Sequence, residues 1–292
     1  MYVLFLATYK GLKVLEAAIE KQVKLRLVIV GRDTKISNDY SKEIVSMCLE
    51  NSIKYTFTVK DVEYIKTDIM LAVSWQRLIH NPFNNLIIFH DSLLPEYRGF
   101  APLVNMLIQG ERKIGVTTLF AETTYDTGPI ILQKAININY PIKIIDAISD
   151  IVKIYKFLAY NIFDMEINKI KGIAKKQDNS KASYSIWRDT EDYKIDWADT
   201  SLKILRHIHA VGYPYRGALT TLEKKNVRIL DAEIVPDVRI INRDIGKVIF
   251  NTDGFPIVIC GSGLLKILEA KFEYENSSQS IIPSKKIKLR FL

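Results

Sequence analysis

Tyr2-Val3-Leu4-Phe5-Leu6 and Leu25-Arg26-Leu27-Val28-Ile29-Val30 are the two stretches of sequence that decide the fold. Both runs are almost entirely apolar, which is typical of strands buried on both faces of a sheet. Residues 10–21 between them carry apolar side chains at helical spacing: Leu12, Leu15, Ala18 and Ile19. Because the strands and the helix follow one another with short connections, the order predicts a parallel, doubly wound sheet.

The same alternation continues through the first part of the chain. We expect helices over residues 41–49 and 144–167, and strands over 55–59, 69–75 and 86–90. Residues 115–122 and 129–138 read as one or two further strands. Polar residues 172–182 read as a linker, because the apolar periodicity stops there.

Short apolar runs dominate the remainder of the chain. After a helix over residues 201–211, we expect strands at 227–234, 246–250, 256–260 and 264–271, with Asp253-Gly254 and Gly261-Ser262-Gly263 as turns. The predicted fold class is therefore α/β. Residues 1–180 form a Rossmann-like, doubly wound, mostly parallel domain, and residues 181–292 supply a linker helix and a small β-barrel-like (OB-like) domain.

Composition and charge limit the class of protein. The net charge of +8 is concentrated in residues 169–181 and 285–290, and neither cluster is interleaved with the aromatic residues that stack single-stranded nucleic acid. We therefore expect that these two basic segments are solvated and that the substrate is a small anion rather than nucleic acid.

Cys48 and Cys260 fit neither a metal site nor a disulfide framework, which indicates a reducing compartment, the cytoplasm. Residues 1–6 read as a strand rather than a signal peptide, and no apolar run is long enough for a membrane span.

Two segments carry the chemistry. The first, His90-Asp91-Ser92-Leu93-Leu94-Pro95-Glu96-Tyr97-Arg98-Gly99, begins where a predicted strand ends, and ligands of parallel sheets bind at that edge. The second is Tyr125-Asp126-Thr127-Gly128-Pro129. A lone histidine at a strand end is often structural, and Asp-Thr-Gly alone can be a turn. The ordered pair is far more specific than either segment.

This pair resembles the folate-dependent formyltransferases, a family that includes methionyl-tRNA formyltransferase and the nucleotide-sugar N-formyltransferases. The resemblance extends over nearly the whole chain, through residues 2–7, 74–79, 101–103, 115–117, 182–184, 195–197, 213–218, 246–248 and 260–263. It implies 10-formyltetrahydrofolate as the co-substrate and no metal.

The resemblance also implies a role for each site residue. Formyl transfer to an amine passes through a tetrahedral intermediate, which needs a base for the amine and a donor for the oxyanion. His90 would be the base, with Asp126 stabilising its imidazolium and lying near the leaving folate nitrogen. The implied folate pocket comprises Trp75, Gln76, Arg77, Leu78, Ile79, Tyr125 and Asp126. The implied substrate contacts are Ser92, Leu94, Pro95, Tyr97, Arg98 and Gly99.

One position departs from the family pattern. Formyltransferases of this group carry an asparagine two residues before the histidine, where this chain has Ile88. Isoleucine donates no hydrogen bond, and loss of one oxyanion donor typically costs about 10²–10³ in rate. Gln76 at a strand end, Asn105 on the following helix, a water or a backbone amide are the candidate replacements.

The segment Gly31–Tyr40 helps to predict which molecule carries the amine that is formylated. Enzymes that act on tRNA carry a basic insertion at this place, whereas this segment is short and nearly neutral. We therefore expect a nucleotide-linked amino sugar, as a step towards lipopolysaccharide or another surface glycan, with an intermediate of the pseudaminic acid type as one guess. Methionyl-tRNA, a folate- or sugar-binding protein without activity, and a formyl-folate hydrolase are the alternatives. A homodimer through the small β-domain is also possible.

Overall fold

The computed structural model describes residues 1–292 except 60–67, 80–84, 274–279, 283, 285 and 287. Lys285 of the basic tail therefore lies outside the described residues. The chain divides into two compact units. The first contains residues 1–103, 112–138 and 147–187, and the second contains residues 104–111, 139–146 and 188–292.

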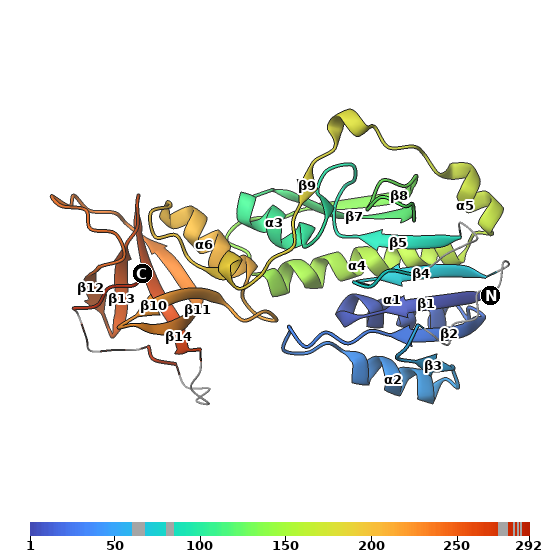
Figure 1. Cartoon of the computed structure of the whole chain (residues 1–292), viewed down its shortest axis with the longest axis horizontal. Helices are drawn as coiled ribbons and strands as arrows, with labels where there is room; N and C mark the ends of the chain where they lie inside the picture. The colour runs from blue at the N-terminus through green and yellow to red at the C-terminus, as the bar shows by residue number, and fades with distance from the viewer. Residues whose placement is uncertain (60–67, 80–84, 274–279, 283, 285, 287) are drawn as a thin grey trace. The chain divides into compact units, whose positions relative to one another are not determined.

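A seven-stranded sheet forms the centre of the first unit, in the order β3-β2-β1-β4-β5-β7-β8 (Figure 1). Its strands are β1 (Tyr2–Leu6), β2 (Leu25–Val30), β3 (Tyr55–Thr56), β4 (Ile69–Val73), β5 (Leu86–His90), β7 (Lys113–Phe120) and β8 (Ile130–Asn137). The first five are parallel to one another, and β7 and β8 add antiparallel pairs at one edge. The predicted doubly wound, mostly parallel sheet is confirmed.

The helices largely follow the apolar periodicity. They are α1 (Thr8–Glu20), α2 (Ser41–Glu50), α3 (Pro102–Gln109), α4 (Ile144–Phe163) and α5 (Ile167–Ile173). The single helix predicted over residues 144–167 is wrong at its end. Glu166 has an extended backbone (φ −74°, ψ 152°) and lies immediately before α5, so two helices form in place of one.

A five-stranded antiparallel sheet forms the second unit, together with helix α6 (Ser201–Ala210). Its order is β10-β11-β14-β13-β12, made of β10 (Ala218–Leu222), β11 (Lys225–Val235), β12 (Val248–Thr252), β13 (Phe255–Ile259) and β14 (Leu264–Phe272). The Asp253-Gly254 turn between β12 and β13 has positive φ at both residues, as a tight hairpin requires. The prediction omitted β10.

Residues 289–292 connect the two edges of this second sheet. Thr221 of β10 exchanges two backbone hydrogen bonds with Leu292, and the Val248 N–H of β12 donates to the Leu289 carbonyl. Phe291 between them is fully buried, with its ring 5.7 Å from that of Trp197. The tail therefore closes the sheet into the barrel-like form that the short strands predict.

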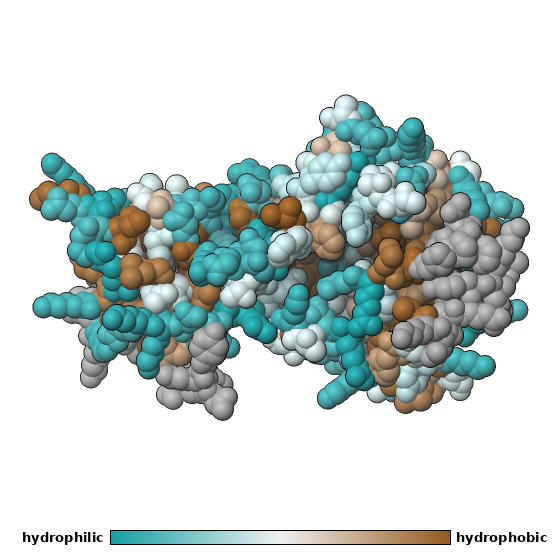
Figure 2. All heavy atoms as spheres, in the orientation of Figure 1, coloured by the Kyte–Doolittle hydropathy of each residue, from teal (hydrophilic) through white to brown (hydrophobic). Residues whose placement is uncertain are grey.

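Hydrophilic residues make up most of the face seen in Figure 2, and hydrophobic residues gather there in small groups. Within the described ranges, no helix combines the length and the apolar character that a membrane crossing requires.

Both cysteines are free and buried, as predicted. Burial raises the pKa of Cys48 to about 11. Burial is also the largest effect on Cys260 and raises its pKa to about 12.

Candidate active site

Several residues that follow strands of the first sheet have positive φ. Thr8 follows β1 and Ser74 follows β4, and both have φ above +50°, as do Tyr97 and Asp126 in the two predicted site segments. Non-glycine residues rarely adopt this region, and such strain is concentrated at functional sites. Because β1, β4 and β5 are parallel, their carboxyl ends lie at one edge of the sheet, where doubly wound folds bind ligands.

His90 is the last residue of β5, pairs with Thr117 of β7, and is buried. Its Nε2 lies 2.8 Å from the Tyr97 carbonyl oxygen. A carbonyl has no proton to donate, so Nε2 carries the proton in the neutral ring and Nδ1 has the free lone pair. Nδ1 in turn lies 3.6 Å from Asp126 Oδ2. The backbone thus selects Nδ1 as the basic atom, and it faces a carboxylate.

Asp126 reaches His90 from the loop between β7 and β8. The Gly99 N–H donates to Asp126 Oδ2 at 2.8 Å and fixes the carboxylate that faces the imidazole. Gly99 has φ +98°, and an added Cβ would lie 2.5 Å from the Ser185 carbonyl oxygen. Only glycine fits at this position. The structure therefore brings together His90 and Asp126, the two predicted catalytic residues.

The loop after His90 is held by buried hydrogen bonds. Thr117 Oγ1, on the strand beside His90, donates to the Ser92 carbonyl at 2.6 Å and accepts from the Leu94 N–H at 3.1 Å. Gln133 Nε2 donates to the Leu94 carbonyl and to Thr117 Oγ1, at 2.8 Å each. Ser92 and Leu94 are buried and support the loop, while their predicted contact with substrate stays a prediction.

Arg98 is also buried, and its guanidinium contacts a segment that was predicted to be a linker. Its Nε and Nη2 donate to Gln177 Oε1 at 3.1 and 2.7 Å, and Nη2 donates to Asn179 Oδ1 at 2.8 Å. Tyr97 and Gly99 on either side are held by Ser183 and Ser185. The solvated-linker interpretation of residues 172–182 is wrong at Gln177, because its side chain is 7% exposed.

Ile88 lies in β5 between Ala72 of β4 and Leu119 of β7. Its side chain packs against the apolar cluster that also receives Trp75 and Ile79. Residues two apart in a strand share a face, so Ile88 lies on the His90 face of the sheet. Trp75 Nε1 is buried and has no hydrogen-bond partner in the described part of the chain. The position that the family fills with asparagine is thus part of an apolar wall.

The remaining predicted folate residues are more exposed. Gln76 and Arg77 are exposed, Leu78 is 88% exposed, and Tyr125 is exposed beside Phe100, with ring centroids 5.7 Å apart. These side chains are available to a ligand, and their assignment to folate stays a prediction.

The two predicted donors that could replace the family asparagine differ in position. Gln76 follows β4, the strand next to β5, and its Nε2 donates to Asp33 Oδ2 at a long 3.3 Å. Asn105 belongs to the second unit, where its Oδ1 accepts from Arg188 Nη2 at 2.6 Å. Gln76 thus lies in the same unit as His90, while Asn105 binds within the other unit.

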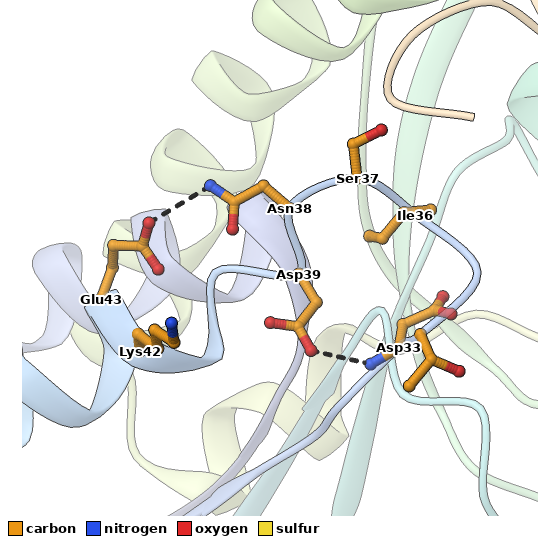
Figure 3. A pocket seen from close by; sticks show the side chains of 8 residues that line it. Asp33, Ile36, Ser37, Asn38, Asp39, Lys42 and Glu43 are labelled. Atoms are coloured by element: carbon orange, nitrogen blue, oxygen red, sulfur yellow. Dashed lines mark hydrogen bonds between the residues drawn. The ribbon is translucent and has the colours of Figure 1, made fainter. Parts of the chain in front are cut away.

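A surface cavity of about 440 Å³ is lined by residues between Asp33 and Glu43, which overlap the segment Gly31–Tyr40 used above to predict the acceptor (Figure 3). Asp33, Asp39, Lys42 and Glu43 supply its charges. Burial opposes charge on Asp39, but hydrogen bonds from Ser41 and Asp33 outweigh it and hold the pKa of Asp39 below its usual value. The charged side chains that line this cavity are thus three carboxylates and one lysine.

A second cavity of about 540 Å³ lies beside the Asp126 loop, lined by Glu122, Thr124, Thr127, Pro129, Lys176, Gln177 and Asn179. Across the described residues, no group of three or more His, Cys, Asp or Glu side chains could hold a metal ion.

Comparison with protein-family models gives two matches. The model described as formyl transferase matches residues 39–152, and the model of the formyl transferase C-terminal domain matches residues 188–280. A methionyl-tRNA formyltransferase of Carboxydothermus hydrogenoformans is 30% identical over an alignment of 227 residues that covers 73% of this chain and 70% of the relative.

Two solved structures share the fold at low sequence identity. WlaRD, a sugar 3N-formyl transferase solved with dTDP and 5-N-formyl-THF, has a TM-score of 0.68 at 20% identity, covering 94% of this chain and 98% of its own. An N-formyltransferase from Helicobacter canadensis, solved with folinic acid and dTDP-3-aminofucose, has a TM-score of 0.70 at 18% identity, covering 91% and 98%.

Proposed function

Since this chain belongs to the formyl transferase family, we propose that it transfers the formyl group of 10-formyltetrahydrofolate to the amino group of a nucleotide-linked amino sugar. The observation that carries the chemistry is the pair formed by His90 Nδ1 and Asp126 Oδ2, 3.6 Å apart, with the proton of the neutral ring held on Nε2 by the Tyr97 carbonyl.

The pair accounts for the proton movements of the reaction. As the amine attacks the formyl carbon, its nitrogen becomes cationic and must lose a proton. His90 Nδ1 accepts this proton, and the imidazolium forms opposite the Asp126 carboxylate, which stabilises it. The same proton then passes to the departing folate nitrogen. Throughout these steps the Gly99 N–H holds the Asp126 carboxylate and the Tyr97 carbonyl holds the His90 ring.

The apolar wall of Trp75, Ile79 and Ile88 supports a planar formyl donor on the His90 face of the sheet. A buried indole N–H without a partner is costly, and a hydrogen-bond acceptor on the bound pterin would satisfy Trp75 Nε1. Gln76 is our candidate for the oxyanion donor. Its bond to Asp33 is long and exposed, so the amide can exchange it for a substrate oxygen at little cost.

The nearly neutral segment at residues 31–43 supports a small acceptor. A loop that follows tRNA phosphates needs an excess of positive charge, whereas the cavity in this segment is lined by Asp33, Asp39 and Glu43 against Lys42. The sugar N-formyltransferases that share the fold were solved with dTDP or a dTDP-amino sugar. Methionyl-tRNA is the second candidate, favoured by the sequence relatives. With a nucleotide sugar as the acceptor, we propose that the reaction is a step of surface glycan synthesis in the cytoplasm.

The test supplies the full chain with 10-formyltetrahydrofolate and a panel of nucleotide-linked amino sugars, alongside methionyl-tRNA. We expect tetrahydrofolate release and one added formyl group with a sugar only. Turnover with methionyl-tRNA alone would exclude the sugar acceptor.

His90→Ala and Asp126→Asn are expected to lower kcat by about 10²–10⁴, and full activity of His90→Ala contradicts the mechanism. Gln76→Ala should cost at least about tenfold in kcat if Gln76 is the oxyanion donor.

A further inference from the structure

Gln177 is a buried polar side chain that the reaction above does not use. It lies between the two segments that carry the chemistry and contacts both of them. Its Oε1 accepts from Arg98 Nε and Nη2 in the His90 loop. Its Nε2 donates to the carbonyls of Asp126 and Gly128, at 2.7 Å each. One carboxamide therefore makes four hydrogen bonds, two to each segment.

These contacts require a carboxamide. A primary amide has two N–H donors and an acceptor oxygen, so it can serve a guanidinium and two carbonyls at once. Glutamate could accept from Arg98 but could not donate to the carbonyls, and methionine could do neither. The Arg98 bonds are charge-assisted, and they polarise the amide so that its N–H groups donate more strongly.

The two carbonyls that Gln177 binds lie on either side of Thr127, in a turn that contains a residue of positive φ. Asp126 has φ +55°, a conformation that costs free energy for any non-glycine residue and persists only when its surroundings enforce it. Both ends of the Asp126–Gly128 turn are held by Gln177, and the carboxylate is held by the Gly99 N–H. Together these contacts set the 3.6 Å approach of Asp126 Oδ2 to His90 Nδ1.

We propose that Gln177 is a positioning residue for formyl transfer: it fixes the backbone of the Asp126 turn against the His90 loop, so that the carboxylate faces the basic nitrogen. This inference rests on the proposed function. It also predicts a physical consequence that does not need turnover, because the Gly99 amide proton reports the position of the Asp126 carboxylate.

The experiment compares Gln177→Glu with Asn179→Ala in the full chain. Gln177→Glu keeps the Arg98 contact and removes both donors to the Asp126 turn, whereas Asn179→Ala removes one Arg98 acceptor and leaves the turn unchanged. We expect Gln177→Glu to lower kcat by about 10–100-fold with KM within about twofold, since a displacement of about 1 Å in a site costs up to about 10²-fold. Asn179→Ala should stay within about threefold of wild type.

The second readout is amide hydrogen exchange at Gly99, followed by NMR. Protection of the Gly99 N–H should fall at least about tenfold in Gln177→Glu and stay unchanged in Asn179→Ala. Gln177→Met replaces Gln177→Glu if the charged variant does not fold. Equal losses of kcat in Gln177→Glu and Asn179→Ala, or unchanged kcat and protection in Gln177→Glu, would overturn the proposal. An inactive wild type would contradict the proposed function, and the exchange result would still decide the role of Gln177.

Discussion

His90 owes its orientation to the main chain. The Tyr97 carbonyl holds the Nε2 proton, and the Gly99 N–H holds the carboxylate that faces Nδ1. Tyr97 has positive φ, which strains a non-glycine residue, so the loop that binds the two side chains is itself strained. Substitutions that relax this backbone will therefore act on the chemistry without touching either catalytic side chain.

Ile88 gives a prediction at the scale of one residue. Ile88→Asn places an amide on the His90 face of β5, in an apolar wall where burying it costs about 1–3 kcal/mol of unfolding free energy. If the site lacks an efficient oxyanion donor, kcat should rise by about tenfold while the melting temperature falls. Steady-state kinetics and thermal unfolding measure the two effects.

Ile88→Val is the matched control, because it changes the volume of the same side chain without adding a donor. It should leave kcat near wild type. A folded Ile88→Asn variant with no gain in kcat would mean that another group already supplies the donor, and the loss in Gln76→Ala then decides whether that group is Gln76.

The residues predicted from sequence were those with an ordered motif around them. His90 and Asp126 could be named because each lies in a specific run. Gln177 could not, since it lies among lysines, aspartate and asparagine, a composition typical of exposed chain. Its burial depends on Arg98, which lies far away in sequence, and only the tertiary structure brings the two together.

At the scale of elements, one polar contact connects helix α1, strand β5 and helix α4. Asp91, directly after His90, accepts from Lys10 of α1 and from the hydroxyl of Tyr155 of α4. Burial, and then the Asp91 charge, raise the pKa of Tyr155 well above its usual value, so the phenol stays protonated and donates. The contact ties the end of β5 to two helices.

Tyr155→Phe removes this donor and leaves one Asp91 oxygen without it, which should cost about 1–3 kcal/mol of unfolding free energy. Tyr160→Phe on the same helix is the control. Its hydroxyl binds Glu20 at an exposed position, and its loss should cost under about 0.5 kcal/mol. Urea unfolding of both variants measures the difference, and equal costs would contradict a special role for the Asp91 contact.

The elements that sequence could not predict are those set by tertiary contacts. The two-residue strands β6 (Arg98–Gly99) and β9 (Tyr184–Ser185) pair with each other and are too short to have a periodicity of their own. Strand β10 follows a glycine and turns into β11 through Glu223 and Lys224, which adopt positive φ without the glycine or asparagine that usually marks such a turn.

At the scale of the whole molecule, the second sheet depends on its closing tail. Phe291→Ala should cost about 3–5 kcal/mol of unfolding free energy, because the ring is fully buried beside Trp197. Leu292→Ala is the control, since that side chain is 67% exposed and its contacts with Thr221 are made by backbone. Unfolding in urea, followed by tryptophan fluorescence, gives both values, and similar costs would mean that the tail does not stabilise the sheet.

Asp231 makes the stability of the second unit depend on pH. Burial opposes its charge, but hydrogen bonds and charges from His209 and Lys143 outweigh burial and lower the pKa of Asp231 to about 2. A lowered carboxyl pKa stabilises the fold above the unfolded value of about 4, and this contribution is lost as the pH falls towards 2.

Asp231→Asn should therefore cost about 2 kcal/mol of unfolding free energy at pH 7, and the difference from wild type should shrink between pH 4 and about pH 2. Asp150→Asn, which removes an exposed pair with Lys153, is the control and should cost under about 0.5 kcal/mol at any pH. Denaturant unfolding across this range is the measurement, and a difference that stays constant with pH would contradict the assignment.

The tail that closes the second sheet also sets an order of events during synthesis. A ribosome makes β10 to β14 before it makes residues 289–292, which bond to Thr221 of β10 and to Val248 of β12. Until residues 289–292 have been made, these positions present unpaired backbone groups that can pair with other nascent chains. A chaperone that shields them should therefore matter most until residues 289–292 have paired with the sheet, and slow codons shortly before residue 289 should increase aggregation.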